Sequence, residues 1–519
     1  MTTPIIHTSP LPDVEIPAMA LTPYVLAHAA RLGDKPALID GPTGRTLTYA
    51  RLAGAVASLA GGLVARGFTP GSTLAVMAPN MPEYAVAFHG VAMAGGVVTT
   101  INPTYTAKEV RHQLVDAGAT ILVTVGMFLD TAREAAEATA VEDIYVIGEA
   151  EGARSFTELM GDPIEQVAVD PDDLVVLPYS SGTTGLSKGV MLSHRNLVAN
   201  IAQTVSTAEL TEDESFVAVL PFFHIYGMQV LMNCGLRAGG TIITAPRFDL
   251  VQFLQLNAEH GCTRAFVAPP IVVALAKHPI VDDHDLSALT QIVSGAAPLS
   301  AELAVQAGRR LSCEVVQGYG MTELSPVSHL TVPGGFKPGS VGVTAPNTEC
   351  MIVDPTSGES VGLDTDGELW VRGPQVMRGY LNNTEETAAT IDEDGWLRTG
   401  DIARIDGDGH VYIVDRLKEL IKYKGFQVPP AELEALLLTH PDVADAAVVG
   451  LPDEEAGEIP VGYVVLKDGA TASGSDIMAF VAGEVATYKQ IRRLSVVAEI
   501  PKSASGKILR RVLREQAGA

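Results

Sequence analysis

Residues Tyr179 to Gly189 read Tyr-Ser-Ser-Gly-Thr-Thr-Gly-Leu-Ser-Lys-Gly and directly follow the apolar run Leu174 to Leu177. Glycines leave backbone N–H groups open to a polyphosphate, while hydroxyl and ammonium groups supply further hydrogen-bond donors around it. The stretch therefore predicts a phosphate-binding loop that follows a strand.

Two other interpretations of this stretch must be weighed. A nucleotide-binding P-loop requires G-x-x-x-x-G-K-[ST], but Ser187 stands where that motif, counted from Gly182, needs its second glycine, and Gly189 follows Lys188. A kinase or GTPase is therefore disfavoured. A flexible polar loop is the usual fate of Gly/Ser/Thr clusters, and the stretch alone leaves it open.

The length and composition indicate a multidomain globular enzyme. A chain of 519 residues exceeds the usual range for one domain, so we expect at least two. The hydrophobic share of 47% and charged share of 18% are typical of a soluble protein and not of a disordered chain.

Charge and cysteine usage exclude several classes of partner. A net charge of −26 disfavours nucleic acid, because binding to the phosphate backbone depends on clustered Lys and Arg. The four cysteines form no C-x-x-C pair, which favours free thiols in a reducing compartment. Met1 to Pro17 lacks a signal-peptide pattern and no apolar run reaches membrane-spanning length, so we expect a cytoplasmic protein.

Hydrophobic periodicity predicts alternating helices and strands over the first part of the chain. A helical face begins after Thr48 and ends near Gly67, a strand follows at Leu74 to Ala78, and Pro82 suits the first turn of the next helix. Thr106 to Glu109 form a capping box. The alternation continues after the glycine-rich stretch, which predicts two α/β subdomains built on largely parallel sheets.

The sequence pattern changes at about Glu349. Short strands separated by turns predict a β-rich subdomain, and a smaller unit of helices and strands then follows. The predicted fold is thus an α/β protein with a large N-terminal domain, residues 1–417, and a small mobile α+β domain, residues 418–519.

Six further motifs follow the glycine-rich stretch in a fixed order. They begin at Pro221 (PFFHIYG), Ser294 (SGAAPL), Gln317 (QGYGMTE), Trp396 (WLRTGD), Asp415 (DRLKELIKYKGFQ) and Pro501 (PKSASGK). This set resembles the AMP-forming acyl-CoA synthetase and luciferase superfamily of adenylate-forming enzymes, and within it the 4-coumarate:CoA ligases. The resemblance covers nearly the whole chain.

The resemblance implies a two-step reaction that uses ATP, CoA and Mg²⁺. A carboxylate and ATP form an acyl adenylate and pyrophosphate, and the thiol of CoA then displaces AMP to give a thioester. Attack on a polyanion needs positive charge and hydrogen bonds at the phosphates. By the match, residues of five motifs bind ATP or AMP: Ser180, Ser181, Gly182, Thr183, Thr184, Lys188, Gln317, Gly318, Thr322, Asp401, Arg416 and Lys507.

Other roles also rest on the resemblance. Glu323, with Thr184, would hold Mg²⁺, since hard cations prefer oxygen ligands. Lys507 would bridge the substrate carboxylate and the α-phosphate, and His224 would move aside to admit CoA. Catalysis would further involve Lys422, Gln427 and Thr184. Residue types alone would give a solvated lysine, a core histidine and a loop carboxylate at Lys507, His224 and Glu323.

The resemblance places two sets of catalytic residues on the small domain. Lys424 and Gly425, together with Arg247, would contact CoA, and Lys422 would contact the acyl adenylate. Because Lys422 and Lys507 cannot both face one phosphorus, the domain must rotate between half-reactions, with Lys418 as the hinge.

The acyl pocket implied by the match has small and apolar walls. Its residues are Tyr226, Val230, Ala296, Gly318, Pro326, Val327 and Leu330. Space beside Ala296 and Gly318 suits a flat ring on which Tyr226 could stack, but the same walls would accept a medium-length fatty chain.

The sequence departs from the family pattern at several positions. Ser187 replaces a usual proline, Pro429 stands where alanine is common, and Trp370 lies in a segment that lacks the cysteine of the plant enzymes. Arg247 replaces a lysine by a planar guanidinium.

The leading hypothesis is a 4-coumarate-like carboxylate:CoA ligase. A medium-chain fatty acyl-CoA ligase is the nearest alternative, followed by an enzyme that loads a carrier protein and by a non-catalytic nucleotide-binding regulator. The expected partners are the small-molecule acid, ATP and CoA. The assembly state is left open, with a homodimer among the options.

Overall fold

The glycine-rich stretch joins two strands of an eight-stranded sheet. The structure, a computed structural model, describes residues 3–180, 187–424, 426–453, 455–503 and 506–517. The sheet has the order β20-β10-β9-β5-β4-β6-β7-β8. Its strands are β4 (Thr73–Met77), β5 (Val97–Thr100), β6 (Ala119–Val125), β7 (Asp143–Ile147), β8 (Arg154–Ser155), β9 (Leu174–Ser180), β10 (Lys188–Ser193) and β20 (Gly379–Tyr380).

The centre of this sheet is parallel, as the alternating pattern predicted. Strands β9, β5, β4, β6, β7 and β8 run parallel, whereas β10 is antiparallel to both β9 and β20. The β9–β10 pairing sets Lys188 opposite Ser180. Both ends of the glycine-rich stretch are therefore fixed in the sheet.

Three helices of this region begin where the sequence predicted. The Thr48 side chain accepts a hydrogen bond from the Arg51 amide, and Thr106 with Glu109 completes the predicted capping box. Pro82 occupies the first turn of its helix, where a missing N–H costs little. The helices are α1 (Leu21–Val25), α2 (Ala29–Leu32), α3 (Tyr49–Ala65), α4 (Pro82–Met93), α5 (Ala107–Asp116), α6 (Leu129–Ala136) and α7 (His194–Thr207).

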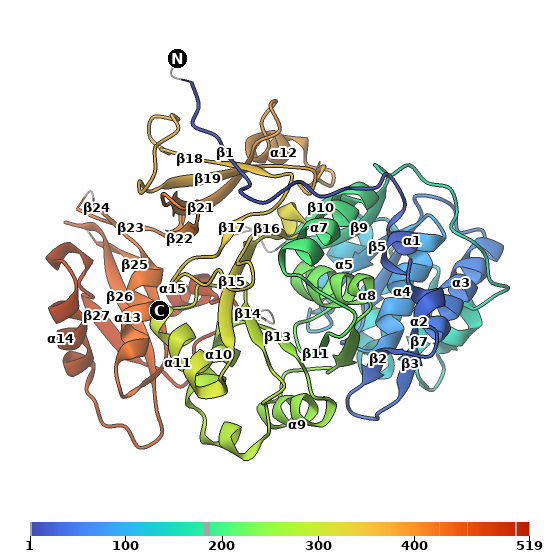
Figure 1. Cartoon of the computed structure of the whole chain (residues 1–519), viewed down its shortest axis with the longest axis horizontal. Coiled ribbons are helices and arrows are strands. Elements are labelled where there is room, and N and C mark those ends of the chain that lie inside the picture. Colours follow the sequence, from blue (N-terminus) through green and yellow to red (C-terminus); the bar gives the residue numbers. More distant parts are fainter. Residues whose placement is uncertain (1–2, 181–186, 425, 454, 504–505, 518–519) are drawn as a thin grey trace.

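A second α/β region lies beside the first in the centre of Figure 1. Two sheets build it, with the orders β11-β12-β2-β3 and β13-β14-β15-β16-β17. The first contains β2 (Pro36–Asp40), β3 (Thr46–Thr48), β11 (Ser215–Ala218) and β12 (Thr241–Thr244). The second contains β13 (Arg264–Val267), β14 (Gln291–Ser294), β15 (Glu314–Gly320), β16 (Val327–Leu330) and β17 (Val343–Thr344).

Helices and a π-helix complete this region. They are the π-helix Tyr226–Cys234, α8 (Gly235–Ala238), α9 (Leu250–His260), α10 (Pro269–Lys277) and α11 (Ala301–Leu311). Along the described chain as a whole, short 3₁₀ turns lie at Gly126–Phe128, Phe156–Leu159, Pro279–Asp283, Thr322–Leu324 and Thr487–Lys489. Strands β13, β14 and β15 run parallel. Ser294 at the end of β14 pairs with Gln317 in β15, so the Ser294 and Gln317 motifs lie side by side in this sheet.

The predicted β-rich part is an antiparallel sheet at the top of Figure 1. Its order is β1-β18-β19-β21-β22. The strands are β1 (His7–Thr8), β18 (Glu349–Val353), β19 (Gly367–Arg372), β21 (Leu397–Ile405) and β22 (Val411–Arg416), accompanied by helix α12 (Thr384–Thr390).

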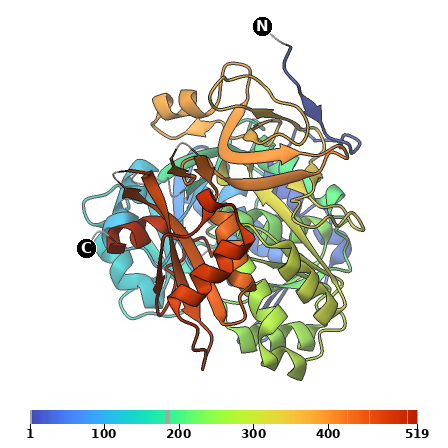
Figure 2. The same ribbon diagram turned by 90° about the vertical axis from the view of Figure 1, so that its left-hand side faces the viewer.

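The C-terminal residues form a separate α/β unit, seen face-on in orange and red in Figure 2. Its sheet has the order β24-β23-β26-β25, with β27 beside β26. The elements are β23 (Ile421–Tyr423), β24 (Phe426–Val428), α13 (Pro430–Thr439), β25 (Val443–Asp453), β26 (Gly457–Leu466), α14 (Gly474–Glu484), β27 (Arg493–Val496) and α15 (Arg510–Ala517). Two apolar clusters drawn only from residues between Ile421 and Leu513 fill this unit.

Two further expectations can be compared with the structure. The thiols of Cys234, Cys262, Cys313 and Cys350 are free, as expected. Over the described ranges, no helix combines the length and apolar character that crossing a bilayer requires.

Candidate active site

Asp401, Arg416 and Tyr319 form the first charged cluster of the site. Asp401 on β21 and Arg416 on β22 are register partners, and Nε of Arg416 lies 3.0 Å from Oδ1 of Asp401. The Tyr319 hydroxyl, on β15, donates to Oδ2 of Asp401 at 2.5 Å. Asp401 is only 4% exposed, and its charge raises the pKa of the Arg416 guanidinium. A buried carboxylate is thus held in place from two sides.

Glu323 lies in a second cluster, where the glycine-rich stretch begins. Its Oε1 accepts hydrogen bonds from the Tyr380 hydroxyl at 2.9 Å and from Oγ of Ser180 at 3.2 Å. Burial raises the pKa of the Tyr380 hydroxyl, and the neighbouring Glu323 charge adds to the effect. The cluster brings Ser180 and Glu323, two predicted site residues, into contact.

Lys188 is paired with a residue that the sequence did not single out. Its ammonium forms an ion pair with Glu386 of α12 and lies 5.1 Å from the centre of the Tyr380 ring. Lys188 and Glu386 are 198 positions apart in the sequence. The ammonium predicted to bind phosphate therefore carries a carboxylate counter-ion in this structure.

Lys507 reaches this region from the C-terminal unit. Burial lowers the pKa of its ammonium, as does the Arg416 charge, whereas Glu419 and Asp401 raise it. The backbone turns at Gly506, which has a φ of +85° and whose added Cβ would lie 3.2 Å from Cβ of Ala268. Glycine both permits this turn and lets the loop approach the large domain closely.

His224 lies two residues before the first residue of the π-helix. Burial, with the Lys507 charge as a second cause, lowers the pKa of His224 to about 4. The ring is therefore neutral at physiological pH, and its Nδ1 accepts a hydrogen bond from the Tyr226 amide at 3.3 Å. The charges of Arg416 and Asp401 act on the pKa of Lys507, and the Lys507 charge acts on that of His224, so these four predicted site residues share one electrostatic environment.

Tyr226 opens the π-helix that forms one wall of the predicted acyl pocket. Its hydroxyl donates to the Val293 carbonyl at 3.2 Å. An added Cβ at Gly295 would lie 2.8 Å from the Tyr226 ring, so this glycine of the Ser294 motif makes room for the ring. π-Helices are rare and often occur at functional sites.

The other predicted pocket residues lie in β15, in or just before β16, in the π-helix and after β14. Gly318 and Leu330 are register partners, and an added Cβ at Gly318 would lie 2.9 Å from Leu330. Val230, Pro326, Val327 and Leu330 are buried, whereas Ala296 is exposed and has a φ of +71°. Gln317 is buried with its side-chain oxygen bonded to the Leu299 amide, and Thr322 is buried in the adjoining 3₁₀ turn.

The residues predicted for the second half-reaction, which contact CoA or the acyl adenylate, form no bond to this cluster where the structure describes them. Lys422, Lys424 and Gln427 are exposed on the β23–β24 hairpin, and Arg247 is exposed after β12. Within the described ranges none of them bonds to Asp401, Arg416 or Glu323. Ser181, Gly182, Thr183, Thr184 and Gly425 lie outside the residues that the structure describes.

Sequence reasoning missed the residues that hold the predicted ones. Tyr319 stands inside the Gln317 motif, so its place in the motif could have drawn attention to it. Tyr380 and Glu386 had no such signal, because only the β10–β20 pairing brings their segment to Lys188.

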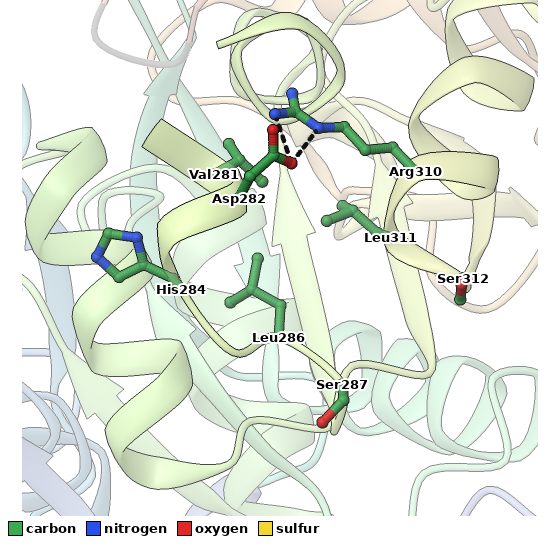
Figure 3. Close-up of a pocket in the computed structure, with 8 residues that line it drawn as sticks. All are labelled: Val281, Asp282, His284, Leu286, Ser287, Arg310, Leu311 and Ser312. Atoms are coloured by element: carbon green, nitrogen blue, oxygen red, sulfur yellow. Dashed lines mark hydrogen bonds and ion pairs between the residues drawn. The ribbon is translucent and has the colours of Figure 1, made fainter. Parts of the chain in front are cut away.

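A surface pocket of about 290 Å³ lies away from these clusters, between the Pro279–Asp283 turn and the end of α11 (Figure 3). Its single cationic guanidinium, Arg310, pairs with Asp282 at 2.8 Å and donates to the carbonyls of Leu275 and His278. These partners leave Arg310 poorly suited to bind an anion, and no predicted site residue lines the pocket.

The geometry can be compared with known proteins. The AMP-binding enzyme family matches residues 25–381, and the C-terminal domain of AMP-binding enzymes matches residues 432–507. The chain belongs to the AMP-binding enzyme family. Residues 382–431, which include Lys418 and the β23–β24 hairpin, lie between the two matched segments.

Curated relatives resemble the chain over almost its full length. It is 44% identical to 4-coumarate--CoA ligase 3 of Oryza sativa subsp. japonica, covering 99% of this chain and 95% of that protein. It is 45% identical to 4-coumarate--CoA ligase 2 of Petroselinum crispum, covering 98% and 96%.

Solved structures share the fold of the whole chain. The anthranilate CoA ligase AuaEII in complex with anthranoyl-AMP superposes with a TM-score of 0.90 at 26% identity, covering 96% of this chain and 98% of that one. ATP-bound MatB from Rhodopseudomonas palustris gives a TM-score of 0.87 at 30% identity, covering 96% and 99%. The predicted fold class, with its separate C-terminal domain, is confirmed.

Proposed function

We propose that this chain is an AMP-forming carboxylate:CoA ligase whose acid is a hydroxycinnamate such as 4-coumarate. The reaction type rests on the Asp401–Arg416 pair and on the docking of the Lys507 segment against the large domain, where an added Cβ at Gly506 would lie 3.2 Å from Cβ of Ala268. The charges of Arg416 and Asp401 act on Lys507 and shift its pKa in opposite directions. The similarity to 4-coumarate--CoA ligases over 98–99% of the chain supports the substrate class.

In the first half-reaction, a carboxylate oxygen attacks the α-phosphorus of ATP. The new P–O bond forms as the bond to the β-phosphate bridging oxygen breaks, which gives an acyl adenylate and pyrophosphate. Lys507 donates hydrogen bonds to the carboxylate and to the α-phosphate, where negative charge accumulates. Asp401 accepts from the ribose hydroxyls, and Arg416 holds Asp401 in place.

Glu323 is suited to hold Mg²⁺. Its carboxylate is 6% exposed and accepts hydrogen bonds from the Ser180 and Tyr380 hydroxyls, and its charge also acts on the Arg416 guanidinium. Glu323, with Thr184 and with oxygens of the nucleotide and water, would hold the ion. Thr184 lies outside the described residues, and within the described ranges there is no cluster of three or more acidic, His or Cys side chains that could hold a metal. When bound, Mg²⁺ offsets phosphate charge.

In the second half-reaction, the CoA sulfur attacks the acyl carbonyl. The C–S bond forms, the C–O bond to AMP breaks, and the thiol proton leaves to solvent. The neutral His224 ring acts as a gate that moves aside for the thiol. Lys422 and Gln427 act on the acyl adenylate while Lys424, Gly425 and Arg247 contact CoA, once the domain has turned about Lys418. Cytoplasmic location and a homodimer remain predictions.

Thioester formation from a panel of acids tests this function. Cinnamates, benzoates and C6 to C12 fatty acids are incubated with ATP, Mg²⁺ and CoA, and both acyl-CoA and AMP are quantified. We expect CoA-dependent AMP release to be fastest with 4-coumarate or a close analogue. Fastest turnover with a fatty acid would replace the substrate class, and AMP release with no need for CoA would contradict the ligase itself.

A further inference from the structure

Helix α13 of the C-terminal unit has each end bonded to a side chain of the large domain. At its beginning, Oδ2 of Asp415 accepts from the Ala431 amide at 2.9 Å. At its end, Nζ of Lys277 donates to the Leu438 carbonyl at 3.3 Å. The first and last turns of a helix leave backbone groups without partners in the helix, and these two contacts satisfy one at each end.

The contact at the beginning of α13 follows from the local sequence. Pro429 is the N-cap residue and Pro430 the first helical residue, so neither a capping side chain nor the first amide is present. Asp415 from β22 supplies the missing acceptor, while its Oδ1 accepts from the Arg416 amide at 2.7 Å. Burial raises the pKa of Asp415 to about 7, while the Ala431 amide opposes this shift.

The contact at the end of α13 lies in a groove between the two domains. The groove has a volume of about 300 Å³ and is lined by residues of α10 and α11 on one side and of the α13 end on the other. Lys277 is half-buried there, and burial followed by the Lys467 charge lowers its pKa. Its ammonium carries charge of the sign that helix C-termini favour.

A buried ion pair connects α13 to the segment that carries Lys507. Glu434 on α13 forms two hydrogen bonds of 2.7 Å to Arg510, which begins α15 directly after the Lys507 loop. Arg510 also donates to Glu419 at 2.5 Å. A shift of α13 would therefore move the segment that carries Lys507.

We propose that Asp415 and Lys277 are positioning residues that hold the small domain in the adenylation arrangement by clamping both ends of α13. This inference rests on the proposed function, because it assumes two half-reactions that need two domain positions. Both contacts join residues on opposite sides of Lys418 and must break when the domain turns. The clamp thus favours adenylation and opposes thioester formation.

The test compares half-reactions in Lys277→Met, which removes the ammonium but keeps an apolar stem. Adenylation is followed by ATP–pyrophosphate exchange, and thioester formation by the reaction of presynthesised 4-coumaroyl adenylate with CoA. Loss of one hydrogen bond from a charged donor should lower the adenylation rate by about tenfold to 150-fold relative to thioester formation. Equal changes in both half-reactions, or none, would overturn the clamp.

Lys467→Met is the matched control. Lys467 lines the same groove but bonds to the Pro441 carbonyl within its own domain, so its loss removes an equal charge without releasing α13. We expect an unchanged ratio of half-reaction rates. A shift as large as that of Lys277→Met would assign the effect to groove charge and overturn the proposal.

Asp415 provides the second pair of variants. Asp415→Asn keeps one side-chain oxygen for the two amides of Ala431 and Arg416 and should shift the ratio less than Asp415→Ala, which removes both acceptors and should shift it in the same direction as Lys277→Met. An unshifted ratio in Asp415→Ala would overturn the role of Asp415, and if that variant does not fold, Lys277 and Lys467 still decide the clamp. Absence of CoA-dependent turnover in the unmodified protein would instead refute the proposed function.

Discussion

The loop that carries Lys507 and the hairpin that carries Lys422 and Lys424 belong to the same small domain but lie in opposite surroundings. Lys507 is half-buried, and burial lowers its pKa, with further effects from the charges of Arg416 and Asp401 in the large domain and of Glu419 and Arg510 in its own. Lys422 and Lys424 are exposed. The difference agrees with the proposed rotation, in which the docking of the domain decides which lysine meets the charged cluster.

The hairpin already has a defined shape within its own domain. Lys422 and Gln427 are register partners, and Phe426, although 54% exposed, stacks on Tyr488 with ring centres 4.6 Å apart. Its strand β23 also pairs with β26. The hairpin therefore needs reorientation as a unit, and no refolding, to act in a second half-reaction.

Removal of Lys507 should have the largest effect on the difference between the two lysine sites. In Lys507→Ala, we expect adenylation to fall by about 10²-fold or more, the scale for losing one preorganised donor to developing charge. Thioester formation from presynthesised acyl adenylate should survive. Pyrophosphate exchange and single-turnover thioester assays measure the two effects separately.

Lys502→Ala is the control for that prediction. Lys502 lies in the same segment but pairs with Asp445 of its own domain at 2.6 Å, so its loss should leave adenylation near the original rate. An equal loss of both half-reactions in Lys507→Ala would show that Lys507 does not belong to one step.

Fixing the hinge should have the reverse effect. Lys418 is exposed in the turn after β22, where the amides of Glu419 and Leu420 both donate to the Arg416 carbonyl. Proline fixes φ near −65°, so Lys418→Pro should hinder a second backbone state. We expect pyrophosphate exchange to persist while CoA-dependent turnover falls by about tenfold or more. An unchanged overall rate would contradict rotation about this residue.

Much of the fold could be predicted because local signals and tertiary structure agree. Thr48 caps α3, Thr106 and Glu109 form the box that starts α5, and the apolar runs form buried parallel strands. The π-helix at Tyr226 had no such signal, because no periodicity in that segment distinguishes it from an α-helix.

The candidate site could be predicted only where a motif carried it. Asp401 and Arg416 stand in separate motifs whose pairing follows from adjacent strands. The Glu386 carboxylate on Lys188 depends on a strand pairing between distant segments, and the Asp415 contact with Ala431 depends on how two domains dock. Neither long-range contact leaves a pattern in a single sequence.

A variant in the proposed acyl pocket tests the large domain, which carries neither the Lys507 loop nor the hairpin. Ala296→Leu should reduce kcat/KM for ring-bearing acids. The expected loss of transition-state stabilisation is roughly 1 to 3 kcal/mol, the scale for a few methylenes in an apolar site. The backbone at Ala296 already has a φ of +71°, and leucine, like alanine, is not β-branched, so stability should change little. Steady-state kinetics with 4-coumarate and hexanoate measure the effect, which should be smaller for the linear acid.

The KM for ATP is the internal control for Ala296→Leu. It should stay constant, because Asp401, Arg416 and Lys188 lie on other elements. A parallel rise in the KM for ATP, or equal losses for both acids, would place Ala296 in the nucleotide wall.

Lys188 is a third lysine of the candidate site, and among the described residues it, unlike Lys507 and Lys422, forms an ion pair with a carboxylate, Glu386. The Lys188–Glu386 ion pair must break before the ammonium can bind phosphate, and its side chains are 22% and 40% exposed. A pair of this exposure contributes about 0.2 to 1 kcal/mol. In Glu386→Gln, which keeps the size of the side chain, the Kd for a non-hydrolysable ATP analogue should therefore fall by about 1.5-fold to fivefold. Isothermal titration calorimetry at low and high salt measures this change, which salt should diminish.

Glu385→Gln removes the same charge from the neighbouring, exposed position and should have a smaller effect. Weaker binding in Glu386→Gln would mean that Glu386 orients Lys188 toward the nucleotide, and equal effects in both variants would reduce its role to general surface charge.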